Sequence, residues 1–225
     1  MLFALNKPVS FAGLLLGFVL AMVVRGVVQR AVFARVSGRR AGLPVFDPKH
    51  DFDVYGIVGA ALGGTGWGRR APVAYGDYAP RYRVALSGPL AVLVLSQLAL
   101  GACFAYAGSL AGISALALSD TLHGLDFNDN VTQFLWSLAA SLLAAGLLML
   151  VPLPPLDGWG VLARRMGPRP SPGFAKAAHW LDDNHIGVVI LLIGLALPIG
   201  GGASAVLLFL FDLISHPIFA LWSAL

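Results

Sequence analysis

Glutamate is absent from the 225 residues of this chain, and charged residues of every kind are scarce. Only 12% of the residues are charged, whereas a typical soluble domain has about 25%. The hydrophobic share is 58% and the mean hydropathy is +0.80. These values argue against a soluble domain and indicate an integral membrane protein that forms one compact unit.

Cysteine occurs once, as Cys103 in an apolar run, which excludes an intrachain disulfide. Lysine and arginine are absent after Lys176 and from the segment 108–130, whereas eight of them lie within 35–83 and four within 164–176. This segregation follows the positive-inside rule. It predicts a multi-pass plasma (inner) membrane protein with cytoplasmic basic loops, an external N-terminus and no nucleic-acid partner. The abundance of alanine, glycine and arginine points to a bacterial source. Arginines follow the apolar run 11–24, so we expect a retained first span rather than a cleaved signal.

Four apolar segments predict membrane spans, at about 8–34, 84–107, 132–151 and 186–215. The segments 35–83 and 152–183 are then cytoplasmic loops, and 108–131 is an outer loop. Pro198 and the glycines at 200–202 interrupt the last segment, so we expect that span to be broken or re-entrant. In the first span, Ser10 is a candidate N-cap, and Gly13 and Gly17 offer a small-residue face for helix packing.

The segment 53–74 alternates apolar residues with glycine. Because glycine disfavours a helix, we expect short strands or a membrane-abutting hairpin here, as a small β element on the cytoplasmic side. A partner could add a strand to the edge of this element. The candidate partner-binding strand carries Gly66, Trp67, Arg69, Pro72 and Val73.

Three blocks of residues occur in a characteristic order. The first is the apolar helix that ends in Ala31, Ala34 and Gly38. The second runs from His50-x-Asp-x-x-x-Gly56 through Gly66-Trp67-Gly68 and Pro72-Val73 to Ser87-Gly88-Pro89-Leu90, and the third is Pro152-Leu-Pro-Pro-Leu-Asp-Gly158. Together the blocks, which cover about residues 8–165, resemble the site-2 protease family of intramembrane zinc metalloproteases. The resemblance implies an α-helical multi-span protein with a site-2 protease-like core.

In that family two histidines, at positions i and i+4 of one helix, bind zinc together with the aspartate of the third block, and a glutamate between them activates the zinc-bound water. The corresponding pentapeptide here is Arg25-Gly26-Val27-Val28-Gln29. A guanidinium group cannot replace an imidazole as a ligand. The resemblance therefore implies a degenerate member that has kept Asp157 and has lost catalysis, zinc and any other cofactor. The vestigial active-site positions are Arg25, Gly26, Gln29 and Asp157.

Without zinc, Asp157 needs another positive charge near the bilayer edge. We expect Arg25 to pair with it, so that one cation replaces another. The alternative is that Arg25 extends to the membrane surface and Asp157 caps a turn. Two clusters of possible metal ligands, His50/Asp51/Asp53 and His179/Asp182/Asp183/His185, are better explained by turns and helix caps.

Three functions remain open. The leading prediction is a non-catalytic accessory subunit, scaffold or assembly factor that lies in the lipid bilayer and binds other integral membrane proteins. The second is an active metalloprotease with unconventional ligands. The third is a small transporter built on the broken last helix, where Asp212 is the obvious intramembrane charge.

Overall fold

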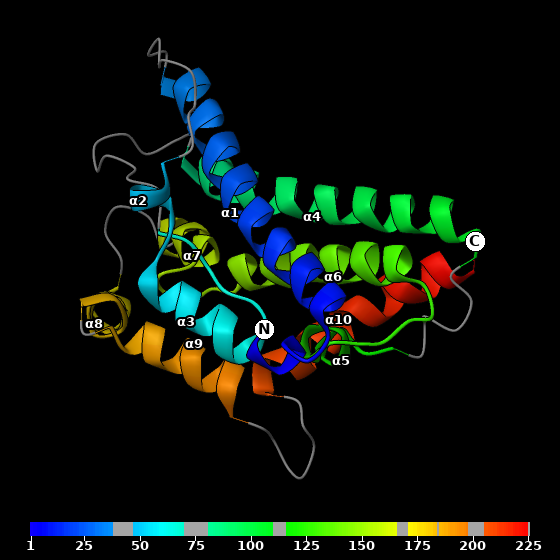
Figure 1. Ribbon diagram of the computed structural model, residues 1–225. Coiled ribbons are helices and arrows are strands. Elements are labelled where there is room, and N and C mark those ends of the chain that lie inside the picture. Colours follow the sequence, from blue (N-terminus) through cyan, green and yellow to red (C-terminus); the bar gives the residue numbers. More distant parts are fainter. Residues whose placement is uncertain are drawn as a thin grey trace.

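The computed structural model describes residues 1–37, 47–69, 81–109, 116–165, 171–183, 185–197 and 205–224. Within these ranges the chain is mainly helical, and Phe52 and Gly68 form an isolated antiparallel bridge. A short 3-10 turn, η1 (Leu2–Ala4), precedes the α-helices, and the Met1 amine donates to the carbonyl oxygen of Ala60 at 3.0 Å. Figure 1 shows the arrangement of the helices.

Three long helices form the centre of the molecule: α1 (Pro8–Ser37), α4 (Arg81–Ala107) and α6 (Asn130–Leu150). Each packs against the other two, and α6 is the most buried. On α1, Gly13 and Gly17 face α6 so closely that an added Cβ would lie 2.6 Å from the Phe134 carbonyl oxygen and 2.7 Å from the Ser141 Cβ, respectively. The predicted small-residue face is therefore used inside the chain, where it lets two helices approach each other.

Four helices are long and apolar enough to cross a membrane: Pro8–Val36, Tyr82–Ala107, Asn130–Leu150 and Val206–Ser223. The first three agree closely with the predicted spans. The predicted span 186–215 is instead divided into α9 (Ile186–Ala196) and α10 (Val206–Ser223). Because α9 is only about 16 Å long, it cannot cross a hydrocarbon core of about 30 Å. The interrupting residues 198–202 lie outside the described ranges.

Short helices occupy the predicted loops. The helices α2 (Pro48–Asp51) and α3 (Val54–Gly63) lie between α1 and α4, and α5 (Leu118–His123) lies between α4 and α6. After α6 come α7 (Asp157–Arg165) and α8 (Pro172–Asp183). Asp47 and Asp53 accept hydrogen bonds from the backbone N–H groups of Lys49 and Tyr55 and thereby cap α2 and α3.

The prediction that glycines would prevent a helix at 54–63 is wrong. The helix α3 forms because Gly56, Gly59 and Gly63 lie on one face, where an added Cβ would meet the Trp67 carbonyl oxygen at 1.8 Å, the Trp67 ring at 2.9 Å and the Leu195 Cβ at 2.8 Å, respectively. Close packing on that face offsets a helix cost of about 1 kcal/mol per glycine. The helix ends at Gly64, which is left-handed (φ 77°).

The predicted β element is likewise not found among the described residues. The chain from Gly64 to Arg69 is irregular apart from the bridge at Gly68, and Trp67 is buried at 1% exposure. Residues 66–69 therefore do not form the predicted strand. Pro72 and Val73, the other end of that candidate strand, lie outside the described ranges.

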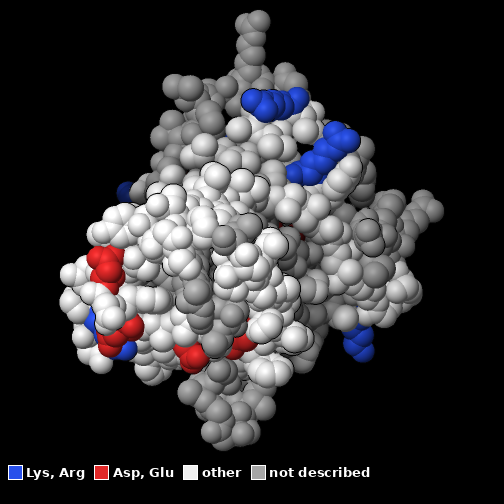
Figure 2. All heavy atoms as spheres, turned by 90° about the vertical axis from the view of Figure 1, so that its right-hand side faces the viewer, with Lys and Arg blue, Asp and Glu red and all other residues white. Residues whose placement is uncertain are grey.

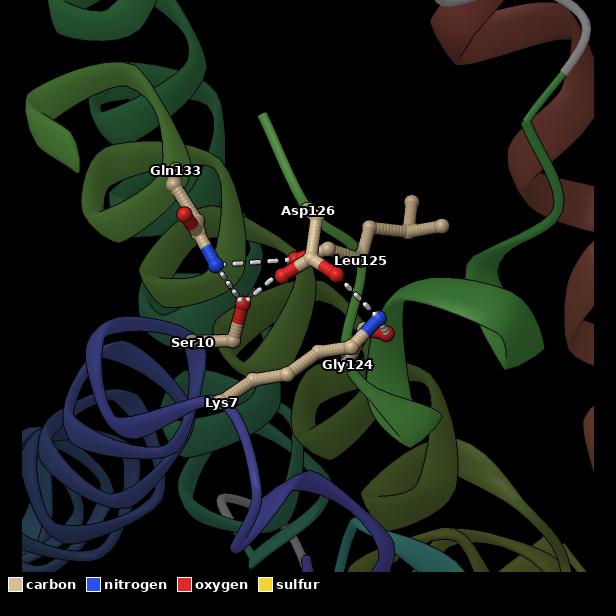
Figure 3. A network of polar contacts seen from close by, with 6 residues as sticks. All are labelled: Lys7, Ser10, Gly124, Leu125, Asp126 and Gln133. Atoms are coloured by element: carbon tan, nitrogen blue, oxygen red, sulfur yellow. Dashed lines mark hydrogen bonds and ion pairs between the residues drawn. The ribbon is translucent and has the colours of Figure 1, made fainter. Parts of the chain in front are cut away.

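A polar network ties the start of α1 to the segment before α6 (Figure 3). Ser10, predicted as an N-cap, lies inside α1, where its hydroxyl donates to the Leu125 carbonyl at 2.8 Å and accepts from Gln133 at 2.9 Å. Beside it, Lys7 pairs with Asp126 at 2.8 Å. Figure 2 shows basic side chains at the upper end of the molecule, the level at which α1 ends in Figure 1, and a group of acidic side chains at the lower left.

Candidate functional site

Arg25 and Asp157, which are 132 positions apart, meet in the interior of the protein. The Arg25 Nε donates to Asp157 Oδ2 at 2.6 Å, and Nη2 donates to Oδ1 at 2.8 Å. Each side chain is only 4% exposed. The contact is a two-point guanidinium–carboxylate pair, the strongest geometry for these groups. The predicted pairing is confirmed.

Asp157 is positioned by the junction between α6 and α7. It is the first residue of α7, where the helix dipole favours a negative charge. The next residue, Gly158, lies so close to the end of α6 that an added Cβ would be 2.1 Å from the Leu150 carbonyl oxygen. Only glycine permits this approach, which explains physically why glycine follows the aspartate in this motif.

On α1, Arg25 and Gln29, two of the positions predicted to be vestigial, are four residues apart and therefore lie on one helix face. Gly26 is buried beneath Asp51 of α2, and an added Cβ would lie 3.2 Å from that carboxylate. Asp51 itself forms an ion pair with Arg30. The glycine at position 26 therefore makes room for the carboxylate of Asp51.

A third segment closes over the ion pair. The Arg25 Nη1 donates to the carbonyl oxygen of Arg69 at 2.8 Å. An added Cβ on the preceding Gly68 would lie 3.1 Å from that same nitrogen and 3.0 Å from the Met22 sulfur. The guanidinium of Arg25 thus binds α7 on one side and the segment after α3 on the other.

The helix α4 approaches the site through Gly88. An added Cβ there would lie 2.8 Å from the Arg25 Cγ and 2.9 Å from the Gln29 Nε2. Gln29 is 2% exposed, and among the described residues neither its amide nitrogen nor its amide oxygen has a hydrogen-bond partner. Such a buried amide group is costly when it is left unsatisfied.

The residues present do not suit zinc. Both carboxylate oxygens of Asp157 accept hydrogen bonds from a permanent cation, and Arg25 has no lone pair to donate to a metal. In the described part of the chain, no three histidine, cysteine, aspartate or glutamate side chains converge in a way that could hold a metal ion. Of the two alternative clusters, the one at 50–53 is used for structure, since Asp51 pairs with Arg30 and Asp53 caps α3.

Sequence reasoning identified Arg25, Gln29 and Asp157 but missed the Arg30–Asp51 pair, the Arg69 carbonyl and the role of Gly88. The first could have been suspected, because Arg30 lies five residues beyond Arg25 on an apolar helix and also needs a counter-charge. The other two depend on backbone positions that the side-chain pattern does not reveal.

Asp212, the predicted intramembrane charge, lies away from this site. Its carboxylate accepts hydrogen bonds from the Ser119 backbone N–H at 2.8 Å and the Ser119 hydroxyl at 2.7 Å, at the start of α5. These contacts give Asp212 a structural role that joins α10 to α5.

Comparisons of the chain with family models, curated proteins and solved structures find no match. The resemblance to site-2 proteases therefore stays a prediction from the residues.

Proposed function

We propose that this chain is a non-catalytic membrane protein with a site-2 protease-like core, and that it works as an accessory subunit or scaffold for other integral membrane proteins. The observation that carries the proposal is the buried Arg25–Asp157 pair. A charged arginine bonded to both oxygens of the aspartate takes the place that the resemblance assigns to a metal ion.

The chemistry of the site supports a binding role over a hydrolytic one. Hydrolysis in the resembled family requires a glutamate base, and the chain contains no glutamate. Aspartate could serve instead, but the two nearest aspartates, Asp51 and Asp157, are each paired with an arginine. A carboxylate held by a guanidinium is a poor proton acceptor.

The distribution of charge supports an orientation. The basic residues of 35–83 and 164–176 would face the cytoplasm of a bacterial cell, and Lys7 with the acidic 120–129 segment would face outward. The helices α1, α4, α6 and α10 would then cross the inner membrane, where their exposed apolar side chains meet lipid and partner helices.

Purification from native membranes in mild detergent tests the proposed role. We expect a second membrane protein to remain bound at a fixed ratio through successive columns, and the purified chain to show no proteolytic activity. Recovery of the chain alone, with about one zinc ion per molecule and activity that a chelator abolishes, would overturn the proposal.

A designed variant tests the core geometry separately. In R25H/Q29H, two histidines at i and i+4 would face Asp157, which recreates a three-ligand zinc site. We expect this double variant to retain about one zinc ion per chain by elemental analysis. The control R25M/Q29M, which removes the same groups without adding ligands, should retain none. Equal zinc contents in the two variants would argue against a site-2 protease-like arrangement.

A further inference from the structure

The helix α8 is held against α7 by a pair of aromatic rings. Phe174 stacks on Trp159, with ring centroids 5.7 Å apart and an angle of 21° between the ring planes. Trp159 is only 6% exposed and belongs to the first turn of α7. In Figure 1, α7 and α8 are seen almost along their axes, whereas α4 and α6 are seen from the side. The two short helices therefore run across the direction of these spans, as a helix that lies along a membrane surface would.

The end of α8 lies where the chain enters its last apolar part. The helix ends at Asp183, and no charged residue occurs from 186 to 211. The next helix, α9, begins at Ile186 and packs against α8. The boundary between water and hydrocarbon therefore falls close to residue 185. This places α8 at the level of the lipid headgroups.

One side of α8 contacts the rest of the protein. Phe174, Ala178 and Leu181 recur at i, i+4 and i+7, and all three are half-buried. The remaining residues from 172 to 182 are exposed. The helix thus has two exposed flanks, one on each side of its protein contact, and the two flanks differ in character.

The first flank consists of Gly173, Ala177 and Trp180, which form a row at i, i+4 and i+7. We call these three residues the apolar flank. Trp180 is 54% exposed. Lys176 precedes it by four residues and lies one turn back on the same side. An interfacial helix uses such residues to place an aromatic ring among the headgroups while a lysine amine reaches their phosphates.

The opposite row, Ala175, His179 and Asp182, is the polar flank, and it is also exposed. A carboxylate on this side is repelled by anionic lipid, so the polar flank suits water. The segment 164–176, by contrast, carries four basic residues and no acidic one. Positive charge at the start of the helix matches the negative potential of a membrane surface that contains anionic lipids.

We propose that α8 lies in the plane of the membrane surface, with the apolar flank among the headgroups of anionic phospholipids and the polar flank in water. Lys176 binds lipid phosphate, and the stack of Phe174 on Trp159 prevents the helix from rotating. A stable protein partner would need about 800 Å² of surface on each side, and the apolar flank is a single row of three residues. This inference does not depend on the proposed accessory role.

Two bimane labels on exposed alanines of α8 test its orientation. Cys103 is the single cysteine, so C103A provides a cysteine-free background. There, A177C places a label on the apolar flank and A175C places one on the polar flank. The full chain is reconstituted in nanodiscs of mixed phosphatidylcholine and phosphatidylglycerol. We expect a nitroxide lipid to quench the label at 177 and iodide to quench the label at 175. Quenching of both labels by the same reagent would overturn the proposal, and so would a label at 177 that protein shields from both reagents.

The preference for anionic headgroups needs a second measurement. The label at 177 is quenched in phosphatidylcholine nanodiscs by nitroxide phosphatidylglycerol or, separately, by the same mole fraction of nitroxide phosphatidylcholine. We expect the anionic lipid to quench more strongly, and K176Q to lower this preference by up to about fivefold, the factor that one basic residue contributes near an anionic surface. The control K49Q, which removes an exposed lysine from α2, should leave the preference unchanged. Equal quenching by the two lipids, or a preference that K176Q does not alter, would overturn the proposal.

Discussion

The buried ion pair makes the sharpest prediction about stability. We consider R25M, D157L and the double variant R25M/D157L, which together form a thermodynamic cycle. Each single variant leaves one buried charge without a partner, because both side chains are only 4% exposed. The double variant leaves no charge at either position.

The magnitudes follow from burial. Breaking a buried pair by removing one partner costs about 3–5 kcal/mol, whereas replacing both partners by apolar residues is often neutral or stabilising. R25M also leaves the Arg69 carbonyl without its donor, which adds a penalty of about 1–3 kcal/mol if no water replaces it. The double variant carries that penalty too, so it should fall within about 3 kcal/mol of the wild type. The coupling energy between positions 25 and 157 should then be at least about 3 kcal/mol.

Reversible unfolding by SDS in mixed micelles measures these free energies, with tryptophan fluorescence as the readout. Trp67 and Trp136 are buried and report the folded state. The matched control is the cycle at Lys7–Asp126, an ion pair whose side chains are 26% and 69% exposed. Its coupling should stay below about 1 kcal/mol, as is usual at a surface. If the two cycles gave equal coupling energies, Arg25 would not be the counter-ion on which Asp157 depends, and the reasoning would fail.

Two further predictions concern the ends of α6. G158A should lower the unfolding free energy by about 1–3 kcal/mol, because its Cβ would overlap the Leu150 carbonyl. The control G173A, on an exposed helix with nothing within 4 Å of the added Cβ, should leave the unfolding free energy unchanged or raise it by up to about 1 kcal/mol. Equal effects of the two variants in the SDS assay would contradict the close approach of α7 to α6. At the N-terminal end of α6, the Asp129 carboxylate accepts hydrogen bonds from Thr132. The bond from the Thr132 backbone N–H has the larger effect and the bond from its hydroxyl the next largest, and both hold the pKa of the Asp129 carboxyl below its ordinary value. Because the folded-state pKa is lowered, this carboxylate stabilises the protein above the ordinary pKa of about 3.9, and the stabilisation disappears as the pH falls through the folded-state value. D129N keeps a side-chain oxygen that can cap the helix but cannot titrate. The melting temperature of D129N should therefore fall less than that of the wild type as the pH is lowered. Identical curves of melting temperature against pH for the two proteins would refute this.

The long spans could be predicted because a single requirement determines them. A helix that crosses hydrocarbon needs about 20 apolar residues, and α1, α4 and α6 each satisfy this with few interruptions. The pairing of Arg25 with Asp157 could be predicted for a related reason. Two opposite charges near the same membrane boundary have few other ways to be neutralised.

The helix α3 could not be predicted, because helix propensity counts only local costs. Gly56, Gly59 and Gly63 each disfavour a helix in isolation. In the folded chain they form the flat face on which Trp67 and Leu195 pack, and Leu195 is more than 130 positions away. The spacing of the three glycines at i, i+3 and i+7 was the available signal, since it places them on one side of a helix. The alternation of glycine with apolar residues instead favoured the two-residue period of a β-strand, which is wrong for this segment.

A glutamate at position 26 would not fit the structure around Asp51. The Cβ of any residue there would lie 3.2 Å from the Asp51 carboxylate, so a glutamate would bring a second negative charge against the first. Asp51 can lie over α1 because Gly26 has no side chain, and from there it neutralises Arg30. Arg25 and Arg30 are thus balanced by Asp157 and Asp51, one to one, within a few turns of α1. A zinc site of the resembled kind would need a different set of charges here, because its glutamate would occupy the space in which Gly26 admits the Asp51 carboxylate.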